Sequence, residues 1–109
     1  MAATRRVRDR AAFAALRTGR RGHAGPVRVT WVPEDGASPP RVAFAVGRRV
    51  GSAVARNRVR RQLRAVMAEL APGLAPGTYL VAYRGAPGVP FTTLSDHVAR
   101  AVASAGARR

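Results

Sequence analysis

Residues 48–64 contain seven arginines and no acidic residue. Arginine suits phosphate because its guanidinium group is planar, permanently charged and able to donate two parallel hydrogen bonds. A solvated helix face usually mixes charges of both signs, and Glu69, beyond the segment, is the one nearby acid that could pair with these arginines. The segment therefore favours contact with the phosphates of a nucleic acid over a solvated basic face.

The same segment has the period of an amphipathic helix. Ser52 can cap a helix over residues 53–70, in which Val59, Leu63, Val66 and Leu70 form one apolar stripe. Side chains on one helical face lie about 5–6 Å apart, which matches a row of backbone phosphates. We interpret Asn57, a mediocre helix former, as a further hydrogen-bonding contact to nucleic acid. The expected contacts are Arg48 and Arg49 before the helix, Arg56 and Arg58 beside the stripe, and Asn57, Arg60, Arg61 and Arg64 opposite it.

Other kinds of chemistry find little support in the sequence. There is no cysteine, so disulfides, thiolate zinc sites and cysteine nucleophiles are excluded. His23 and His97 are lone and far apart, and the five acidic residues form no pattern for acid–base work. We predict no catalytic residue and no metal site in this chain.

Composition defines the class of protein. The chain has 109 residues and a formal net charge of +15, with 20 basic residues, all of them arginine, against five acidic ones. Such self-repulsion is costly for a small fold and is usually tolerated where a polyanion neutralises it. No apolar run is long enough to span a membrane, and no signal-peptide stretch follows the basic N-terminus, so we expect a cytoplasmic protein.

Helix and strand patterns alternate along the chain. Helices are predicted over residues 8–18, capped by Asp9, over 53–70, and from a cap at Thr93 or Ser95 to about residue 105. Strands are predicted over residues 27–32, 41–47 and 78–83, with a basic loop over 19–26. The order indicates one α+β domain over residues 1–109, a small sandwich of an about four-stranded sheet with helices packed on it. We expect a basic tail at about residues 1–8 and a frayed end at 106–109.

Residues 41–67, RVAFAVGRRVGSAVARNRVRRQLRAVM, resemble the signature region of the protein subunit of bacterial ribonuclease P. The shared features are a strand of alternating small and aliphatic residues, a basic pair at Arg48 and Arg49, a glycine before a small polar residue, and an R-N-R helix. The match runs without a gap over a quarter of the chain. Asp9, Phe13 and Gly19 resemble the family's first helix more loosely.

The resemblance implies a function and a set of partners. In this family the RNA subunit is the catalyst, and it uses magnesium ions to remove the 5′ leader of precursor tRNA. The protein binds no cofactor of its own, and it assists by binding the RNA subunit and the leader; neither a membrane nor DNA is an expected partner. The arginine-rich helix would dock on the RNA subunit, within a left-handed βαβ crossover.

The leader would lie in a cleft between the first helix and one face of the sheet. Phe13 matches the family's base-stacking aromatic. Arg17 lies about one turn later, where the family often has a second aromatic. Thr30 or Trp31, which belong to opposite faces of their strand, lies near the position of a cleft-facing tyrosine. Two alternatives remain: another RNA-binding structural protein such as a ribosomal protein, and a stand-alone nuclease, which would need clustered acids or a histidine pair.

Overall fold

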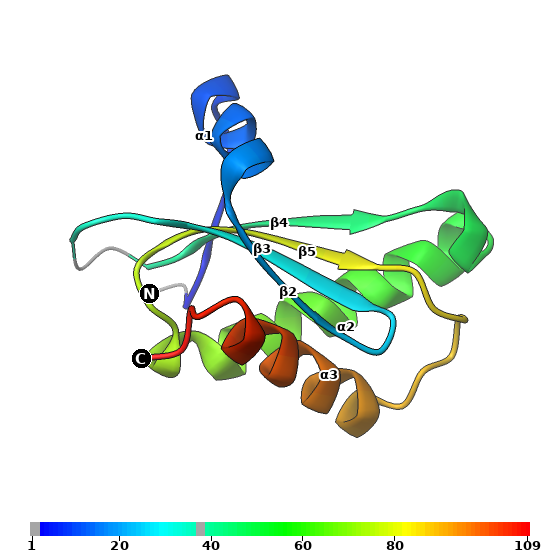
Figure 1. The fold of residues 1–109 in the computed structure, drawn as a ribbon. Coiled ribbons are helices and arrows are strands. Elements are labelled where there is room, and N and C mark those ends of the chain that lie inside the picture. The colour runs from blue at the N-terminus through cyan, green and yellow to red at the C-terminus, as the bar shows by residue number, and fades with distance from the viewer. Residues whose placement is uncertain (1–2, 37–38) are drawn as a thin grey trace.

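The computed structural model describes residues 3–36 and 39–109. One mixed sheet carries two long helices on one face, and a short helix projects from its other side (Figure 1). The strands are β1 (Arg5–Arg6), β2 (Arg20–Ala24), β3 (Val27–Pro33), β4 (Arg41–Val46) and β5 (Gly77–Tyr83). The helices are α1 (Arg10–Ala15), α2 (Ala53–Leu70) and α3 (Phe91–Ser104), with short 3-10 turns at Leu16–Thr18, Arg48–Val50 and Ala71–Gly73.

The sheet has five strands in the order β1-β4-β5-β3-β2. Strands β1, β4 and β5 run parallel to one another, and β3 is antiparallel to both β5 and β2. Helix α2 therefore connects two neighbouring parallel strands, β4 and β5. This is the βαβ crossover expected from the resemblance, and its left-handedness stays a prediction.

The core lies between the sheet and the α2–α3 layer. Because side chains alternate along a strand, one face of β3, β4 and β5 contributes its large apolar residues to this layer. Helix α2 buries the apolar stripe through Val59, Leu63 and Val66, and Met67 joins them in place of the half-buried Leu70. The sheet contributes Val27, Val29, Trp31, Val42, Val46, Tyr79, Val81 and Tyr83, and α3 contributes Leu94, Val98, Ala101 and Val102.

Strand β2 is absent from the sequence prediction. The segment predicted as a basic loop contains β2, which pairs with β3 from Val27 to Trp31. Strand β2 reads RRGHA and shows no apolar alternation, because its buried position is Gly22. A Cβ atom at Gly22 would lie 2.1 Å from the carbonyl oxygen of Ala101, so the missing side chain lets α3 pack directly on the strand.

Parts of both predicted free ends pair with the rest of the fold, and residues 1–2 of the expected tail lie outside the described residues. Strand β1 lies within the predicted tail and pairs with the start of β4, and Val7 is buried. At the other end Leu74 and Arg108 form a β-bridge, and the Arg109 N–H donates to the Gly73 carbonyl at 2.8 Å. The expected fraying at 106–109 is therefore wrong, since backbone hydrogen bonds and the buried Ala107 hold this segment.

Two of the three predicted helix N-caps are confirmed, and the third is wrong. Asp9 and Ser52 cap α1 and α2 as predicted, accepting from the Ala12 and Ala55 N–H groups at 2.7 and 3.2 Å. The predicted cap at Thr93 or Ser95 is wrong, because α3 already begins at Phe91 behind Pro90. Pro90 takes the N-cap position with φ −61° and ψ 142°, and its ring already fixes φ near the helical value. No helix among the described residues is long and apolar enough to cross a membrane.

Candidate nucleic-acid interface

The polar face of α2 is rich in arginine. Burial of the apolar stripe leaves Asn57, Arg58, Arg61 and Arg64 exposed, with Arg56 and Arg60 half-buried beside them. Arg48 and Arg49 are also exposed, on the 3-10 turn that leads from β4 to α2. Six of the eight predicted RNA contacts are therefore exposed along α2 and its entry, and the other two are half-buried.

Asn57 holds one of these arginines in place. Its Oδ1 atom accepts a hydrogen bond from Arg60 Nη1 at 2.9 Å, and Arg60 Nη2 reaches the Val46 carbonyl at 3.4 Å. The amide of Asn57 retains its N–H donors for another partner. Asn57 therefore orients Arg60 against the end of β4, a role that the sequence did not suggest.

The arginines of α2 point to two different sides of the helix. Arg60 and Arg64 lie on the side of β4, where the Arg64 guanidinium stacks over the Phe44 ring at 5.8 Å from its centroid. Arg58 and Arg61 lie on the opposite flank, towards the start of α3, where they line a shallow hollow with Phe91. One basic helix thus serves two surfaces.

A groove of about 640 Å³ follows the free edge of β4, and we call it the β4 groove. It exists because β1 pairs with only Arg41 and Val42, which leaves the rest of the β4 edge without a neighbouring strand. Four arginines and no acidic residue line it. Its lining residues are Thr4, Arg5, Arg6, Val7, Phe13, Val42, Ala43, Phe44, Ala45, Arg60, Arg64 and Leu80.

The β4 groove joins parts of the chain that are far apart in sequence. Phe13 enters from α1 with half of its surface exposed, at 50%. Ala43 and Ala45, the small face of β4, form part of the wall. Sequence reasoning missed Arg5, Arg6 and Leu80, since a two-residue strand such as β1 leaves no periodic signal.

The other predicted leader contacts fall in different environments. Arg17 is exposed on the turn after α1. Thr30 lies on the α1 side of the sheet but is only 3% exposed, with its methyl group packed close to Gly19. Trp31 points to the opposite face: it is 6% exposed, its ring stacks on Tyr79, and its Nε1 donates to the Pro76 carbonyl at 3.2 Å. The prediction that Trp31 could face the cleft is wrong, because register places it in the core.

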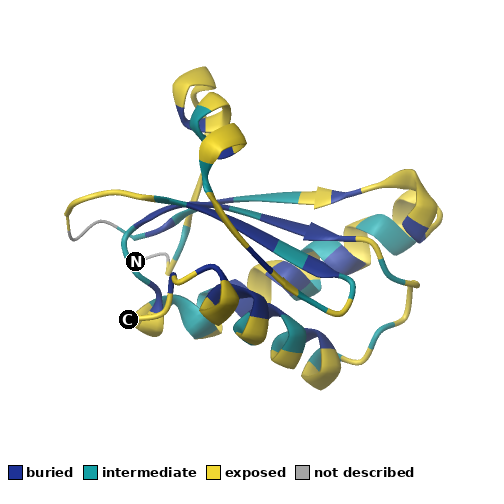
Figure 2. Ribbon diagram, viewed as in Figure 1, coloured by how far each residue is buried: buried dark blue, intermediate teal, exposed yellow. Residues whose placement is uncertain are grey.

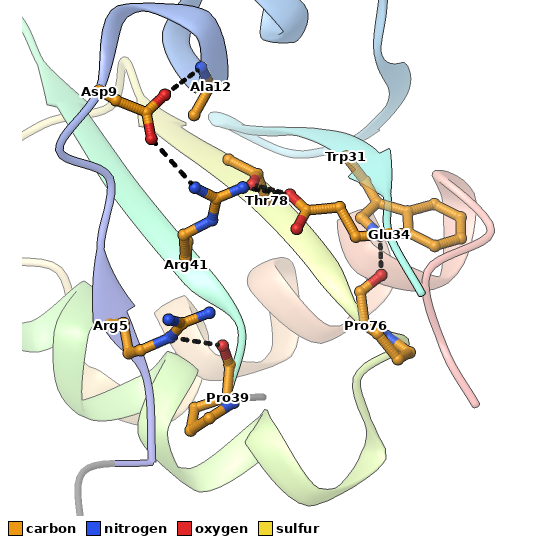
Figure 3. Close-up of polar contacts among 9 residues, drawn as sticks. All are labelled: Arg5, Asp9, Ala12, Trp31, Glu34, Pro39, Arg41, Pro76 and Thr78. Carbon is orange, nitrogen blue, oxygen red and sulfur yellow. Dashed lines mark hydrogen bonds and ion pairs between the residues drawn. The ribbon is translucent and has the colours of Figure 1, made fainter. Parts of the chain in front are cut away.

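A polar network fixes the start of α1 to the sheet (Figure 3). Arg41 on β4 reaches Asp9, the cap of α1, at 3.4 Å and Glu34, after β3, at 2.6 Å. The Thr78 hydroxyl on β5 donates to the same oxygen of Glu34. These bonds lower the pKa of Glu34, the Thr78 hydrogen bond most and Arg41 next. The network connects α1 to three strands and so positions the element that carries Phe13.

Helix α1 depends on that network. Its single buried residue is Ala12, and nearly all of its surface is exposed (Figure 2).

Among residues 3–36 and 39–109, no three histidine, aspartate or glutamate side chains lie close enough together to hold a metal ion. The chemistry that this surface offers is therefore the binding of anions and of flat apolar groups.

Comparison with known proteins agrees with this geometry. The family profile described as Ribonuclease P matches residues 1–106. The chain belongs to this family. A ribonuclease P protein component from Clavibacter michiganensis is 40% identical over 93 residues, which cover 83% of this chain and 81% of that protein. One from Symbiobacterium thermophilum is 36% identical, covering 93% of this chain and 90% of that protein.

The ribonuclease P protein from Thermobifida fusca is 45% identical, and the match spans 70% of this chain but only 57% of that protein's length. Solved structures show the same fold. The RNase P protein of Staphylococcus aureus superposes with a TM-score of 0.81 at 17% identity, over 95% of this chain and 97% of the other. The RNase P protein of Thermotoga maritima gives 0.72 at 21% identity, over 86% and 91%. The family is thus of the bacterial ribonuclease P type, and a ribosomal protein is not favoured.

Proposed function

We propose that this chain binds the RNA subunit of ribonuclease P and the 5′ leader of precursor tRNA, and so assists removal of the leader. The observation that carries the proposal is the β4 groove, in which Phe13 faces Arg60 and Arg64 along an unpaired strand edge. A basic groove with an aromatic side chain suits single-stranded nucleic acid, because guanidinium groups follow the backbone and bases stack on the ring. The leader is such a strand.

We assign different partners to the two flanks of α2. Arg60 and Arg64 belong to the groove and would contact the leader. Arg58 and Arg61, together with Arg48 and Arg49, would contact the RNA subunit. This differs from the sequence prediction, in which the whole helix docks on the RNA subunit, because that prediction had no groove to divide the arginines.

The chemistry of cleavage is assigned to the RNA subunit and its magnesium ions. Protein free of RNA should therefore leave precursor tRNA intact even with magnesium present, whereas protein added to a bacterial ribonuclease P RNA at low magnesium should promote 5′ processing. We expect this activity in the cytoplasm, where tRNA precursors are processed. Cleavage by the protein alone would contradict the proposal.

The double variants Arg60→Ala/Arg64→Ala and Arg58→Ala/Arg61→Ala form a matched pair. Each removes two guanidinium groups, whose charge-assisted hydrogen bonds are worth at most about 1.5–3 kcal/mol apiece. The first variant should weaken binding of leader-bearing substrate more than leaderless substrate. The second should weaken assembly with the RNA subunit for both substrates alike. Affinities measured for the RNA subunit and for the two substrates check the division, and equal effects of the two variants would contradict it.

A further inference from the structure

A second apolar surface lies on the other flank of α2, away from the β4 groove. We call it the α2–α3 hollow; it has a volume of about 530 Å³ and is lined by Val54, Arg58, Arg61, Gln62, Ala65 and Phe91. Val54 is 77% exposed, one of two large apolar side chains with such exposure among the described residues, and Phe13 in the groove is the other. Ala65 is exposed as well, and the half-buried Phe91 completes the apolar part of the lining.

The hollow is built by the fold rather than by chance exposure of one side chain. Gln62 Nε2 donates to the Val89 carbonyl at 3.1 Å, which ties the segment before α3 to α2. Phe91, the first residue of α3, is half-buried and packs against the core, so its ring is held in place. The hydrogen bond of Gln62 and the packing of Phe91 together fix the shape of the hollow.

Charge indicates the kind of occupant. Two guanidinium groups, those of Arg58 and Arg61, stand at the hollow, and none of its lining residues is acidic. A second copy of this chain would bring another net charge of +15 to the same place. A nucleotide suits both the apolar lining and the charge of the hollow: its base offers a flat apolar face to Phe91, and its phosphates pair with arginine.

We propose that the α2–α3 hollow binds an unpaired nucleoside of the RNA subunit, with the base against Phe91 and Val54 and the flanking phosphates on Arg58 and Arg61. This inference rests on the proposed function and deepens it. On this proposal α2 contacts RNA through a base-binding site as well as through phosphates. The chain then has two aromatic platforms on opposite flanks of one helix, Phe13 for the leader and Phe91 for the RNA subunit.

Salt dependence separates a base contact from a phosphate contact. Loss of one phosphate contact reduces the slope of log affinity against log salt by about one, whereas loss of stacking weakens binding by the same factor at every salt concentration. Stacking of one base is worth about 1–3 kcal/mol, or roughly 5- to 140-fold in affinity at about 1.4 kcal/mol per tenfold. Phe91→Ala should therefore weaken binding to ribonuclease P RNA by this factor with an unchanged slope, and Arg61→Ala should lower the slope.

Because Phe91 also packs on the core, a second variant tests the hollow without touching the fold. Ala65 is exposed on α2, and Ala65→Leu would fill the hollow from that position. We expect it to weaken binding to ribonuclease P RNA by 5-fold or more. The matched control is Ala103→Leu, the same substitution at an exposed position of α3 outside the hollow, which should bind like the parent chain.

The outcomes are distinct. Weaker binding by Phe91→Ala and Ala65→Leu at unchanged slope, with the Ala103→Leu control unaffected, supports the proposal. If both variants bind normally while Arg61→Ala is impaired, the base site is absent although the proposed function stands. If Arg61→Ala also binds ribonuclease P RNA normally, and Arg60→Ala/Arg64→Ala binds leader-bearing substrate normally, the proposed function itself fails. Self-association of the RNA-free chain in sedimentation, abolished by Ala65→Leu, would show that the hollow binds a second copy and would overturn the proposal.

Discussion

Phe13 and Trp31 are both large aromatic residues near the expected leader path, and the fold gives them opposite environments. Phe13 projects from a helix that buries one residue, so its ring is available to a ligand. Trp31 is enclosed between the sheet and the helices, where its N–H has a protein partner. Side-chain type alone does not separate a stacking platform from a core residue; the face of the element does.

Substitution of Phe13 tests the platform. Phe13→Ala should reduce affinity for precursor tRNA with a long leader by about 1–3 kcal/mol, the range found for loss of one base–aromatic stack. It should change affinity for leaderless substrate little, because the ring contacts no other part of tRNA in this proposal. Circular dichroism is expected to match the parent chain, since half of the ring is exposed. Equal weakening for both substrates would place the leader elsewhere.

Trp31→Phe tests the corrected placement of the tryptophan. The change removes the Trp31 hydrogen bond to the Pro76 carbonyl, which keeps the bond that it accepts from the Glu34 N–H, so urea unfolding should show a loss of about 0.5–1.5 kcal/mol. The ratio of affinities for long-leader and leaderless substrates should stay at the parent value. A change in that ratio of affinities, with an unchanged free energy of unfolding, would show that Trp31 contacts the leader.

At the scale of elements, α1 is the least supported helix and the Arg41 network is what fixes it to the sheet. Asp9 serves twice there, as the cap of α1 and as a partner of Arg41. Glu34 accepts from Arg41 and from Thr78, so it links the end of β3 to β4 and β5. The orientation of Phe13 thus depends on charged groups at some distance from its ring.

The Glu34 carboxylate makes this network sensitive to acid. Its pKa is lowered in the folded chain, so it contributes stability that is present above its ordinary pKa of about 4.3 and is lost as pH falls through the lower, folded value. Glu34 is partly exposed, with 37% of its side chain accessible, so Glu34→Gln should cost no more than about 1 kcal/mol at pH 7.

The variant should also flatten the loss of stability on acidification below about pH 4.3, since the titrating group is absent. Urea unfolding at several pH values measures both effects. The matched control is Asp96→Asn, which removes an exposed acid that pairs with Arg100 on α3, away from this network. If Glu34→Gln loses as much unfolding free energy on acidification as the parent chain does, Glu34 does not contribute to the pH dependence of stability.

At the scale of the whole molecule, charge dominates. The chain carries a net charge of +15 on 109 residues, and among the described residues the arginines in ion pairs with acidic side chains are Arg41 and Arg100. Such a surface binds nucleic acid largely by releasing counterions from phosphates. In the proposed complex, RNA would thereby neutralise the self-repulsion that the free chain carries.

Binding to ribonuclease P RNA should therefore weaken steeply with salt. If about six phosphates are neutralised, log affinity should fall with log salt with a slope of about −4 to −5, depending on whether the contacted RNA is single- or double-stranded. Titration of the complex at four or more salt concentrations gives the slope. A nearly flat dependence would mean that the arginine surfaces are not the contact.

The sequence by itself determined the features that depend on neighbours along the chain. Helix α2, its Ser52 cap, its apolar stripe and its arginine face all follow from local spacing, and so do strands β3, β4 and β5. The family was also readable there, because residues 41–67 form one uninterrupted segment. These features are local since hydrogen bonds and side-chain contacts within a helix, and alternation within a strand, involve residues a few positions apart.

Tertiary structure alone decided which distant residues share a surface. Strands β1 and β2 exist because partners across the sheet complete their hydrogen bonds, and neither carries an apolar alternation that predicts it. The β4 groove unites Phe13 with Arg64 because β1 stops pairing after Val42, and the α2–α3 hollow unites Val54 with Phe91 because Gln62 ties the segment before α3 to α2. Strand pairing and helix packing join residues far apart in sequence, so no local spacing reveals which arginines of α2 face which partner.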